Sequence, residues 1–286
     1  MKTILVPIDY SENSQHALRF AIYLLEKSSD LRLIVFHNVE ILIPTSTPQH
    51  LYKEYYQEQF DAKMEELKAE TAKAIQISEL TVAPSRVEYV LKDAFSLDVA
   101  LVETAKEHAV DLIVMGTLGA SGLKKVFVGS NTAKVIDKSE IPVLAIPSGY
   151  AIAPIKKIAY ASDLKDVAAE VGTLVPLAKL FAASIEIFHV YPTYPQWADA
   201  SKGNLEKISA QLHEKYQGQK FNLHVVQTYK ENETVYGIKK FIDSYKPDLL
   251  AMFTVKRTFW DKLFDPSRTE ELAFDTNVPL LTLKKL

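Results

Sequence analysis

The feature of this sequence that most constrains its fold is an internal repeat, because the second half of the chain restates the first. Residues 111–117 spell Asp-Leu-Ile-Val-Met-Gly-Thr, and residues 248–254 spell Asp-Leu-Leu-Ala-Met-Phe-Thr. The same register continues without a gap to Pro142 and Pro279. Self-similarity of this kind predicts that one structural unit is built twice from a single chain.

The beginnings of the two halves also match, but at a different spacing. Residues 2–9 align with residues 156–163, and residues 34–39 align with residues 185–190. The offset is 154 at the start of the repeat and 137 at its end, so the first half carries about seventeen extra residues in its middle. We expect them in the Pro-rich segment at residues 44–48 and in the helix after it.

Each half alternates strand-length apolar runs with helix-length amphipathic stretches. Continuous apolar runs indicate strands that are buried on both faces, and strand–helix alternation predicts a parallel sheet with right-handed crossovers. The fold class is therefore α/β, with two tandem, doubly wound, five-stranded parallel-sheet domains of the Rossmann-like type. The predicted strands of the first half are 3–8, 32–39, 86–91, 111–116 and 141–146, and its predicted helices are 12–28, 51–78, 95–109 and 130–139.

Length and composition agree with two ordinary globular domains. The chain has 286 residues, of which 48% are apolar, and we expect domains at residues 1–147 and 155–286 joined by a linker that contains Pro and Gly. A net charge of −3 and the lack of a basic stripe argue against nucleic acid as a partner. Cysteine is absent, the N-terminus is typical of a first buried strand, and no apolar run is long enough for a membrane helix, so we expect a cytoplasmic protein.

Glycines are concentrated in one loop of the first half. Four of the nine glycines in the chain lie at positions 116, 119, 122 and 129, directly after a predicted strand. Glycine lets the backbone turn sharply and lets an anion approach the backbone. Ser130 follows at a predicted helix N-cap, with the amides of Asn131 and Thr132 behind it, and such a helix start is a natural anion site. Asp9 ends another strand at the same edge of the sheet.

The second half has lost every one of these glycines. Serine and glutamate at Ser267 and Glu270 form a capping-box pattern there, which satisfies the amides of the helix and places negative charge where an anion would sit. Ala133 stands at the corresponding position of the first half, so its helix start is left open. We infer that the first half binds an anion and that the second half does not. The replacements are Phe253, Lys256, Phe259 and Pro266.

The spacing Gly116-x2-Gly119-x9-Gly129-Ser130, together with Asp9 at the end of the first strand, resembles the ATP-binding signature of the universal stress protein family. Each half of the chain resembles one copy of the family's domain, so the resemblance extends over essentially the whole chain, although the glycine motif occurs only in the first half. The resemblance implies an adenine-nucleotide α-hydrolase-like fold. It implies that Pro7, Ile8 and Asp9 line the adenosine pocket, that Val39 contacts the adenine, and that Gly116, Gly119, Gly129, Ser130 and Asn131 hold the phosphates. Met115 and Thr132 complete the predicted site. It also implies pairing of the two halves through residues 141–146 and 278–283, with a further homodimer as an option.

The function that follows is an ATP-binding regulatory protein of the stress response, with one nucleotide per chain. ADP or AMP could replace ATP, and Mg²⁺ could accompany the triphosphate, held mainly by phosphate oxygens and water. Neither a Walker loop nor a nucleophile elbow is present, so we expect no dedicated catalysis. The alternatives are a slow ATP hydrolase or adenylyl-transferring enzyme of the same superfamily, and a scaffold without a ligand. A regulatory role also implies a protein partner of unidentified kind.

Several residues keep a structural interpretation beside the functional one. The glycines could serve merely to shape a tight loop. Asp9 could serve merely as a cap for the helix that follows it, as Asp163 at the matching position of the other half suggests. Lys124 and Lys125 could reach a phosphate, but exposed loop lysines are more often solvated. His37 and His189 repeat within matching strands, which points to shared packing. The tyrosines at 52–56 favour a packing face or a partner surface.

Overall fold

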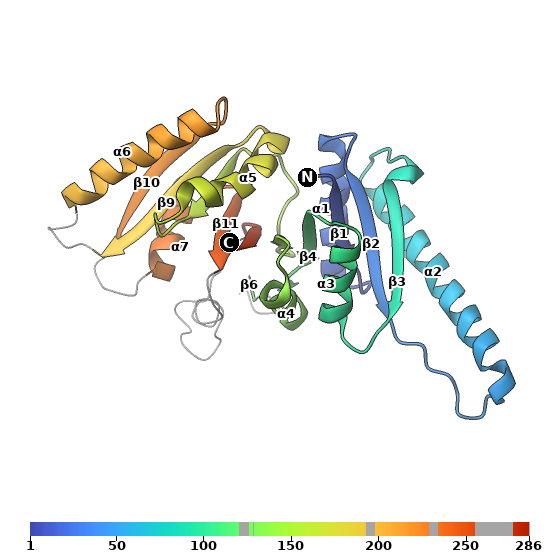
Figure 1. Cartoon of the computed structure of the whole chain (residues 1–286). Helices are drawn as coiled ribbons and strands as arrows, with labels where there is room; N and C mark the ends of the chain where they lie inside the picture. The colour runs from blue at the N-terminus through green and yellow to red at the C-terminus, as the bar shows by residue number, and fades with distance from the viewer. Residues whose placement is uncertain (120–125, 128, 193–197, 229–233, 255–276, 286) are drawn as a thin grey trace. The chain divides into compact units, whose positions relative to one another are not determined.

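We describe a computed structural model of the chain, in which the chain divides into two compact units (Figure 1). The structure describes residues 1–119, 126–127, 129–192, 198–228, 234–254 and 277–285. The first unit comprises residues 1–117 and 129–148, and the second comprises residues 118–128 and 149–286.

The first unit alternates strands and helices as the apolar pattern predicts, and the bounds agree to within a few residues. One face of its sheet carries α1 and α2, which contact each other, and the other face carries α3 and α4, which also contact each other. The strands are β1 Thr3–Pro7, β2 Arg32–Val39, β3 Val87–Asp93, β4 Leu112–Gly116 and β7 Val143–Ile146. The helices are α1 Glu12–Lys27, α2 Tyr52–Ile77, α3 Leu97–Glu107 and α4 Ser130–Lys138, with single 3-10 turns η1 Gln49–Leu51 and η2 Pro84–Arg86.

The sheet of the first unit has the parallel strand order β7-β4-β1-β2-β3. Every residue of β1 and of β7 is buried, because helices cover both faces of the sheet. The chain runs from β1 outward through β2 and β3, and then returns to the other side of β1 with β4. The switch point of this doubly wound sheet therefore lies between β1 and β4, and ligands of such sheets bind outside the carboxyl ends of the strands at that point.

The second unit repeats this architecture, with the parallel strand order β10-β9-β8-β11-β12 and a switch point between β8 and β11. Its helix α5 contains Pro176 and α6 contacts α5. The strands are β8 Lys157–Ala161, β9 Ser184–Pro192, β10 Phe221–Thr228, β11 Leu249–Thr254 and β12 Leu280–Lys284. The helices are α5 Val167–Phe181, α6 Ala198–Lys215 and α7 Thr234–Tyr245.

Individual hydrogen bonds repeat along with the elements. A carboxylate oxygen of Asp111 accepts from the amides of Lys2 and Thr3 at 2.6 and 2.9 Å, and Asp248 accepts from Lys156 and Lys157 at 2.7 and 2.9 Å. These aspartates tie the start of the first strand of each unit to the start of its fourth strand. The repeated Asp-Leu sequence is therefore a structural feature of the repeat.

Backbone dihedrals repeat in the same way. Tyr10 and Leu164 are left-handed at φ 63° and 61°, and Ala109 and Lys246 are left-handed at φ 47° and 45°. The first pair is separated by the offset of 154 and the second by the offset of 137. Non-glycine residues rarely adopt this conformation, so the two units share even their unfavourable turns.

The structure corrects the alignment of the second strands by one residue. Phe36 pairs with Pro7 and Phe188 pairs with Ala161, so the offset there is 152, and our match of residues 34–39 with 185–190 is wrong. The reason is the helix–strand turn, which takes four residues after α1 and two after α5. Two of the seventeen extra residues lie in this turn, and the other fifteen lie between β2 and β4.

Two further features complete the described fold. A short antiparallel ladder, β5 Leu118–Gly119 and β6 Val126–Phe127, was not expected from the sequence. Within the described ranges, none of the helices combines the length and the hydrophobicity that a bilayer-spanning segment needs.

Candidate functional site

The carboxyl end of β1 leads into a tight polar turn before α1. The Asp9 carboxylate accepts hydrogen bonds from the Ser11 amide at 3.1 Å and from the Ser11 hydroxyl at 2.5 Å, and the Ser11 hydroxyl in turn caps α1 by accepting from the Ser14 amide at 3.2 Å. Burial alone would raise the pKa of Asp9, but the hydrogen bonds from Ser11 and Ser14 outweigh it and lower the pKa. Asp9 therefore has a structural role in this turn, and it remains exposed and ionised at neutral pH.

Gly116 ends β4 and lies against the start of α1. A Cβ atom at Gly116 would stand 2.4 Å from the carbonyl oxygen of Asn13 and 2.7 Å from its carbonyl carbon. No side chain fits there unless the backbone moves. On its other side, the Gly116 carbonyl accepts a hydrogen bond from the Thr132 hydroxyl at 3.0 Å. Gly116 thus brings together the start of α1 and the first turn of α4 at the switch point.

No side chain of the described residues caps the first turn of α4. The N-cap residue is Gly129, not Ser130 as we predicted, and Ser130 is the first residue of the helix. Glycine also favours the N-cap, which explains the error of one residue. Gly129 offers no capping side chain, Ser130 and Asn131 are exposed, and no acidic residue lies in the first turn. Amide donors and the positive end of the helix dipole therefore face the switch point.

The adjoining end of β2 carries partly buried polar groups. The His37 ring nitrogen Nδ1 lies 2.7 Å from the carbonyl oxygen of Ile8, and this carbonyl can only accept, so Nδ1 carries the proton. The Tyr10 ring lies 4.7 Å from the His37 ring, and burial together with the charges of Glu66 and Glu70 raises the pKa of Tyr10 to about 12. Asn38 donates to the Ala94 carbonyl at 2.8 Å.

Most other predicted site residues lie around this point. Pro7, Ile8, Val39 and Met115 are buried at the carboxyl ends of β1, β2 and β4. Gly119 lies in the short ladder with β6. Gly122, Lys124 and Lys125 lie outside the described residues, as do Lys256, Phe259, Pro266 and the capping-box residues Ser267 and Glu270.

The switch point of the second unit contains a cavity of about 320 Å³. Phe253 stands there in place of Gly116, and its ring contacts the ring of Tyr160 edge to face at 5.4 Å between centroids. The described residues that line the cavity come from the ends of β8, β9, β11 and β12 and from α5 and α7. They are Tyr160, Ala161, Ser162, Asp163, Glu170, Phe188, His189, Val190, Thr234, Ile238, Met252, Phe253 and Lys285.

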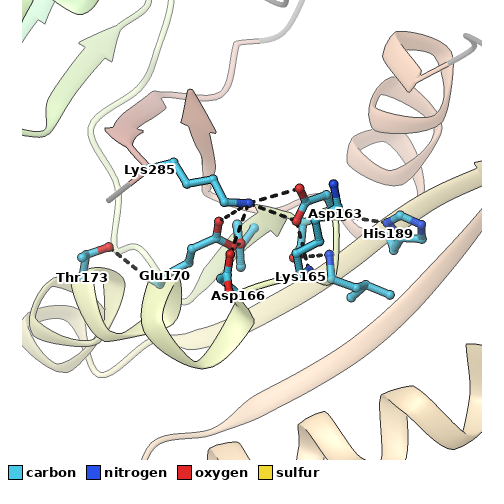
Figure 2. A network of polar contacts seen from close by, with 10 residues as sticks. Asp163, Lys165, Asp166, Glu170, Thr173, His189 and Lys285 are labelled. Atoms are coloured by element: carbon cyan, nitrogen blue, oxygen red, sulfur yellow. Dashed lines mark hydrogen bonds and ion pairs between the residues drawn. The ribbon is translucent and has the colours of Figure 1, made fainter. Parts of the chain in front are cut away.

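Figure 2 shows the polar network at this cavity, centred on Lys285. The ammonium lies 3.1 Å from Asp163, 3.0 Å from Glu170 and 4.0 Å from Asp166. Burial alone would lower the pKa of Lys285, but hydrogen bonds to Glu170 and Asp163 outweigh it and raise the pKa. Tyr160 donates to the other oxygen of Glu170, and burial together with this hydrogen bond raises the pKa of Tyr160 far above its ordinary value.

His189 confirms the shared packing predicted for the two histidines. Its Nδ1 lies 2.7 Å from the Ser162 carbonyl oxygen, as His37 lies against Ile8. The sequence analysis missed Tyr160, Glu170 and Lys285. Their counterparts in the first half, at offsets of 154 and 137, are Val6, His16 and Ser148. The sequence signal that could have identified the three residues is that all three positions differ in charge or size between the two halves.

Comparisons with known proteins agree with this architecture. The family model described as Universal stress protein family matches residues 1–147. Universal stress protein YxiE of Bacillus subtilis is 33% identical over 146 residues, which cover 50% of this chain and 97% of the relative. A universal stress protein of Thermus aquaticus is 29% identical over 145 residues, which cover 51% of this chain and 98% of the relative.

A solved structure extends the likeness in fold to both units. The crystal structure of a universal stress protein from Archaeoglobus fulgidus superimposes with a TM-score of 0.67 and 18% identity, and the match covers 99% of this chain and 98% of that one. At this identity the likeness concerns the fold alone.

Proposed function

The chain belongs to the universal stress protein family, and on this premise we propose that its first unit binds one adenine nucleotide, ATP in particular, as a regulatory protein without dedicated catalysis. The observation that carries the proposal is the start of α4 beside Gly116, where no described side chain caps the helix. Three segments far apart in the sequence meet there, and they offer amide donors, a helix dipole and a glycine without a side chain.

The neighbouring strand ends supply the features that an adenosine group requires. Val39 provides an apolar surface at the end of β2, and its exposed fraction is only 4%. At the preceding residue of β2, the buried Oδ1 of Asn38 has no hydrogen-bond partner among the described residues, while Nδ2 donates to the Ala94 carbonyl. An unpaired buried acceptor is costly, and an exocyclic amino group would satisfy it. The exposed Asp9 carboxylate would accept from a ribose hydroxyl.

Mg²⁺ would accompany the triphosphate through phosphate oxygens and water. Within the described part of the chain, no three His, Asp or Glu side chains group together as metal ligands. Asp9, just after β1, offers a carboxylate at the same edge of the sheet. A metal held in this way would travel with the nucleotide and would not bind the free protein tightly.

The second unit supports the assignment by contrast. Phe253 occupies the position of Gly116, and the cavity beside it carries two carboxylates, Asp163 and Glu170, against one ammonium. Both changes disfavour a polyphosphate. We therefore propose a stoichiometry of one nucleotide per chain.

Ser130→Asp tests the proposed phosphate site without disturbing the fold. Ser130 is exposed in the first turn of α4, where an acidic residue stabilises a helix by about 0.3–1 kcal/mol. A bound phosphate near the new carboxylate would lose about 1–3 kcal/mol at an effective dielectric constant near 20, which weakens ATP binding roughly fivefold to 150-fold. Calorimetric titration with ATP measures both affinity and stoichiometry.

Two matched variants control for this substitution. Ser130→Ala removes the hydroxyl without adding charge, and Ser85→Asp adds the same charge in η2, at the amino edge of the same sheet. We expect the Ser85 variant to bind ATP as the unchanged protein does. Equal ATP affinity in Ser130→Asp and Ser85→Asp would rule out a phosphate at the start of α4.

Five accompanying expectations complete the proposal. Turnover of ATP should stay well below about 1 s⁻¹, the low end of ordinary enzymes. Pairing of the units through β7 and β12, a further homodimer and an unidentified protein partner remain predictions, as does a cytoplasmic location.

A further inference from the structure

We propose that the cavity in the second unit is a binding site for a small organic cation, a primary amine with an apolar body. The cavity lies at the carboxyl ends of β8 and β11, which is the switch point of its sheet. This inference does not depend on nucleotide binding by the first unit.

The inner wall of the cavity is apolar and buried. Phe188 and Ile238 are completely buried and Met252 is 3% exposed, and the rings of Phe253 and Tyr160 stand edge to face beside them. Its volume of about 320 Å³ is at the lower end of the range of small-molecule sites. The wall therefore suits an aromatic or aliphatic body of one ring.

The polar side of the cavity has more acceptors than donors. Lys285 is its one ammonium among the described lining residues, and its three protons face oxygens of Asp163 at 3.1 and 3.3 Å and of Glu170 at 3.0 Å. No donor capacity of Lys285 remains for an anion. Each carboxylate accepts about four hydrogen bonds, so Asp163 and Glu170 retain unused capacity.

The charge balance at the cavity points in the same direction. Asp163 and Glu170 against Lys285 leave a formal charge of −1 on the described lining residues, and Asp166 adds a further carboxylate 4.0 Å from Lys285. The residues Val6, His16 and Ser148 of the first unit correspond to Tyr160, Glu170 and Lys285. The second unit has thus acquired a charged network at the point where it lost its glycine. A cationic head is attracted there, and a phosphate is repelled.

Three probes of nearly equal shape separate charge from hydrophobic fit: 2-phenylethylamine, 2-phenylethanol and 3-phenylpropionate. The chain has four methionines, so methyl-¹³C-methionine NMR yields few signals, with Met252 in the cavity and Met115 at the corresponding position of the first unit. We expect the amine to shift the Met252 signal with a Kd on the order of 1 mM, the alcohol to bind more weakly, and the carboxylate not to bind. The Met115 signal should respond to ATP and not to the amine.

Two substitutions test the two halves of the inference, and a third serves as a control. Asp163→Asn removes one carboxylate and should weaken amine binding roughly threefold to tenfold, because a partly exposed charge contact contributes modestly. Asp9→Asn makes the same change in the first unit and should leave the Met252 response to the amine unchanged. Thr234→Trp places a large ring at the exposed mouth of the cavity and should abolish the response to every probe without altering the charges.

The outcomes separate this inference from the proposed ATP site. A larger Met252 shift with 3-phenylpropionate or with AMP than with the amine would overturn it, as would equal affinities for the amine and the alcohol. Silence of Met252 toward all three probes would also refute it, whatever ATP does to Met115. Failure of ATP to move Met115 would count against the first site alone.

Discussion

Replacement of Gly116 by alanine gives the most direct measurement of how closely β4 approaches α1. The added Cβ would lie 2.4 Å from the carbonyl oxygen of Asn13, whereas ordinary contacts begin at 3.4 Å, so the two segments must separate by about 1.0 Å. The obstructing atoms belong to the backbone, and no side-chain rotation relieves the contact. α1 cannot move freely either, because Ala17, Leu18 and Phe20 are completely buried against the sheet.

The free-energy cost follows from this rigidity. Overpacking by one methyl group costs about 1–3 kcal/mol in well-packed interiors, and we expect the upper end here, about 3 kcal/mol. For a protein of this size, each kcal/mol lowers the melting temperature by about 2–4 °C, so the expected decrease is roughly 6–12 °C for the transition that includes the first unit.

Differential scanning calorimetry measures this shift, with Gly149→Ala as the matched control. A Cβ at Gly149 would meet only the side-chain oxygen of Asn277, at an ordinary distance of 3.6 Å. That variant should melt within about 1–2 °C of the unchanged protein, since substitutions without steric conflict change stability by about 0.5 kcal/mol or less. If both glycine variants melt at the same temperature, the close approach of β4 to α1 is wrong.

Two further predictions concern buried polar groups. The hydrogen bonds and ion pair from Lys138, with help from Ser96, lower the pKa of Asp98, so its stabilising contribution is present above its ordinary pKa of 3.8 and is lost as the pH falls below that value. Urea unfolding of Asp98→Asn should therefore show a stability deficit that is constant at neutral pH and shrinks in acid, and a deficit independent of pH would contradict the ion pair. Tyr160→Phe should cost about 1–3 kcal/mol in the same assay, because it removes a donor from the buried Glu170, whereas Tyr23→Phe should cost nothing, since that buried hydroxyl has no hydrogen-bond partner among the described residues.

The sequence alone was enough to predict the architecture of each unit. Runs such as Leu-Ile-Val-Met before Gly116 are buried strands, and the strand–helix alternation produces the doubly wound sheets. The spacing of apolar residues along the chain specifies these features, because each strand or helix must bury its apolar side chains wherever it lies in the fold. The sequence-based predictions were wrong where more than one residue or turn length suits the same position. Gly129 and Ser130 both suit an N-cap, and the turn after α5 is two residues shorter than the turn after α1.

The residues around each switch point were only partly predictable. Gly116, Ser130 and Asp9 were identified because glycine and capping residues have characteristic local patterns. Lys285 had no such pattern, since a lysine after a final strand is usually solvated.

Tertiary structure alone determined what these side chains contact. It places Lys285 against Asp163, which is 122 residues away in the sequence, and it brings Asn13 within contact distance of Gly116. Proximity of this kind arises because parallel strands from distant parts of the chain end at the same edge of a sheet. Local periodicity specifies which residues are buried, but the contacts across the switch point exist only once the sheet has formed.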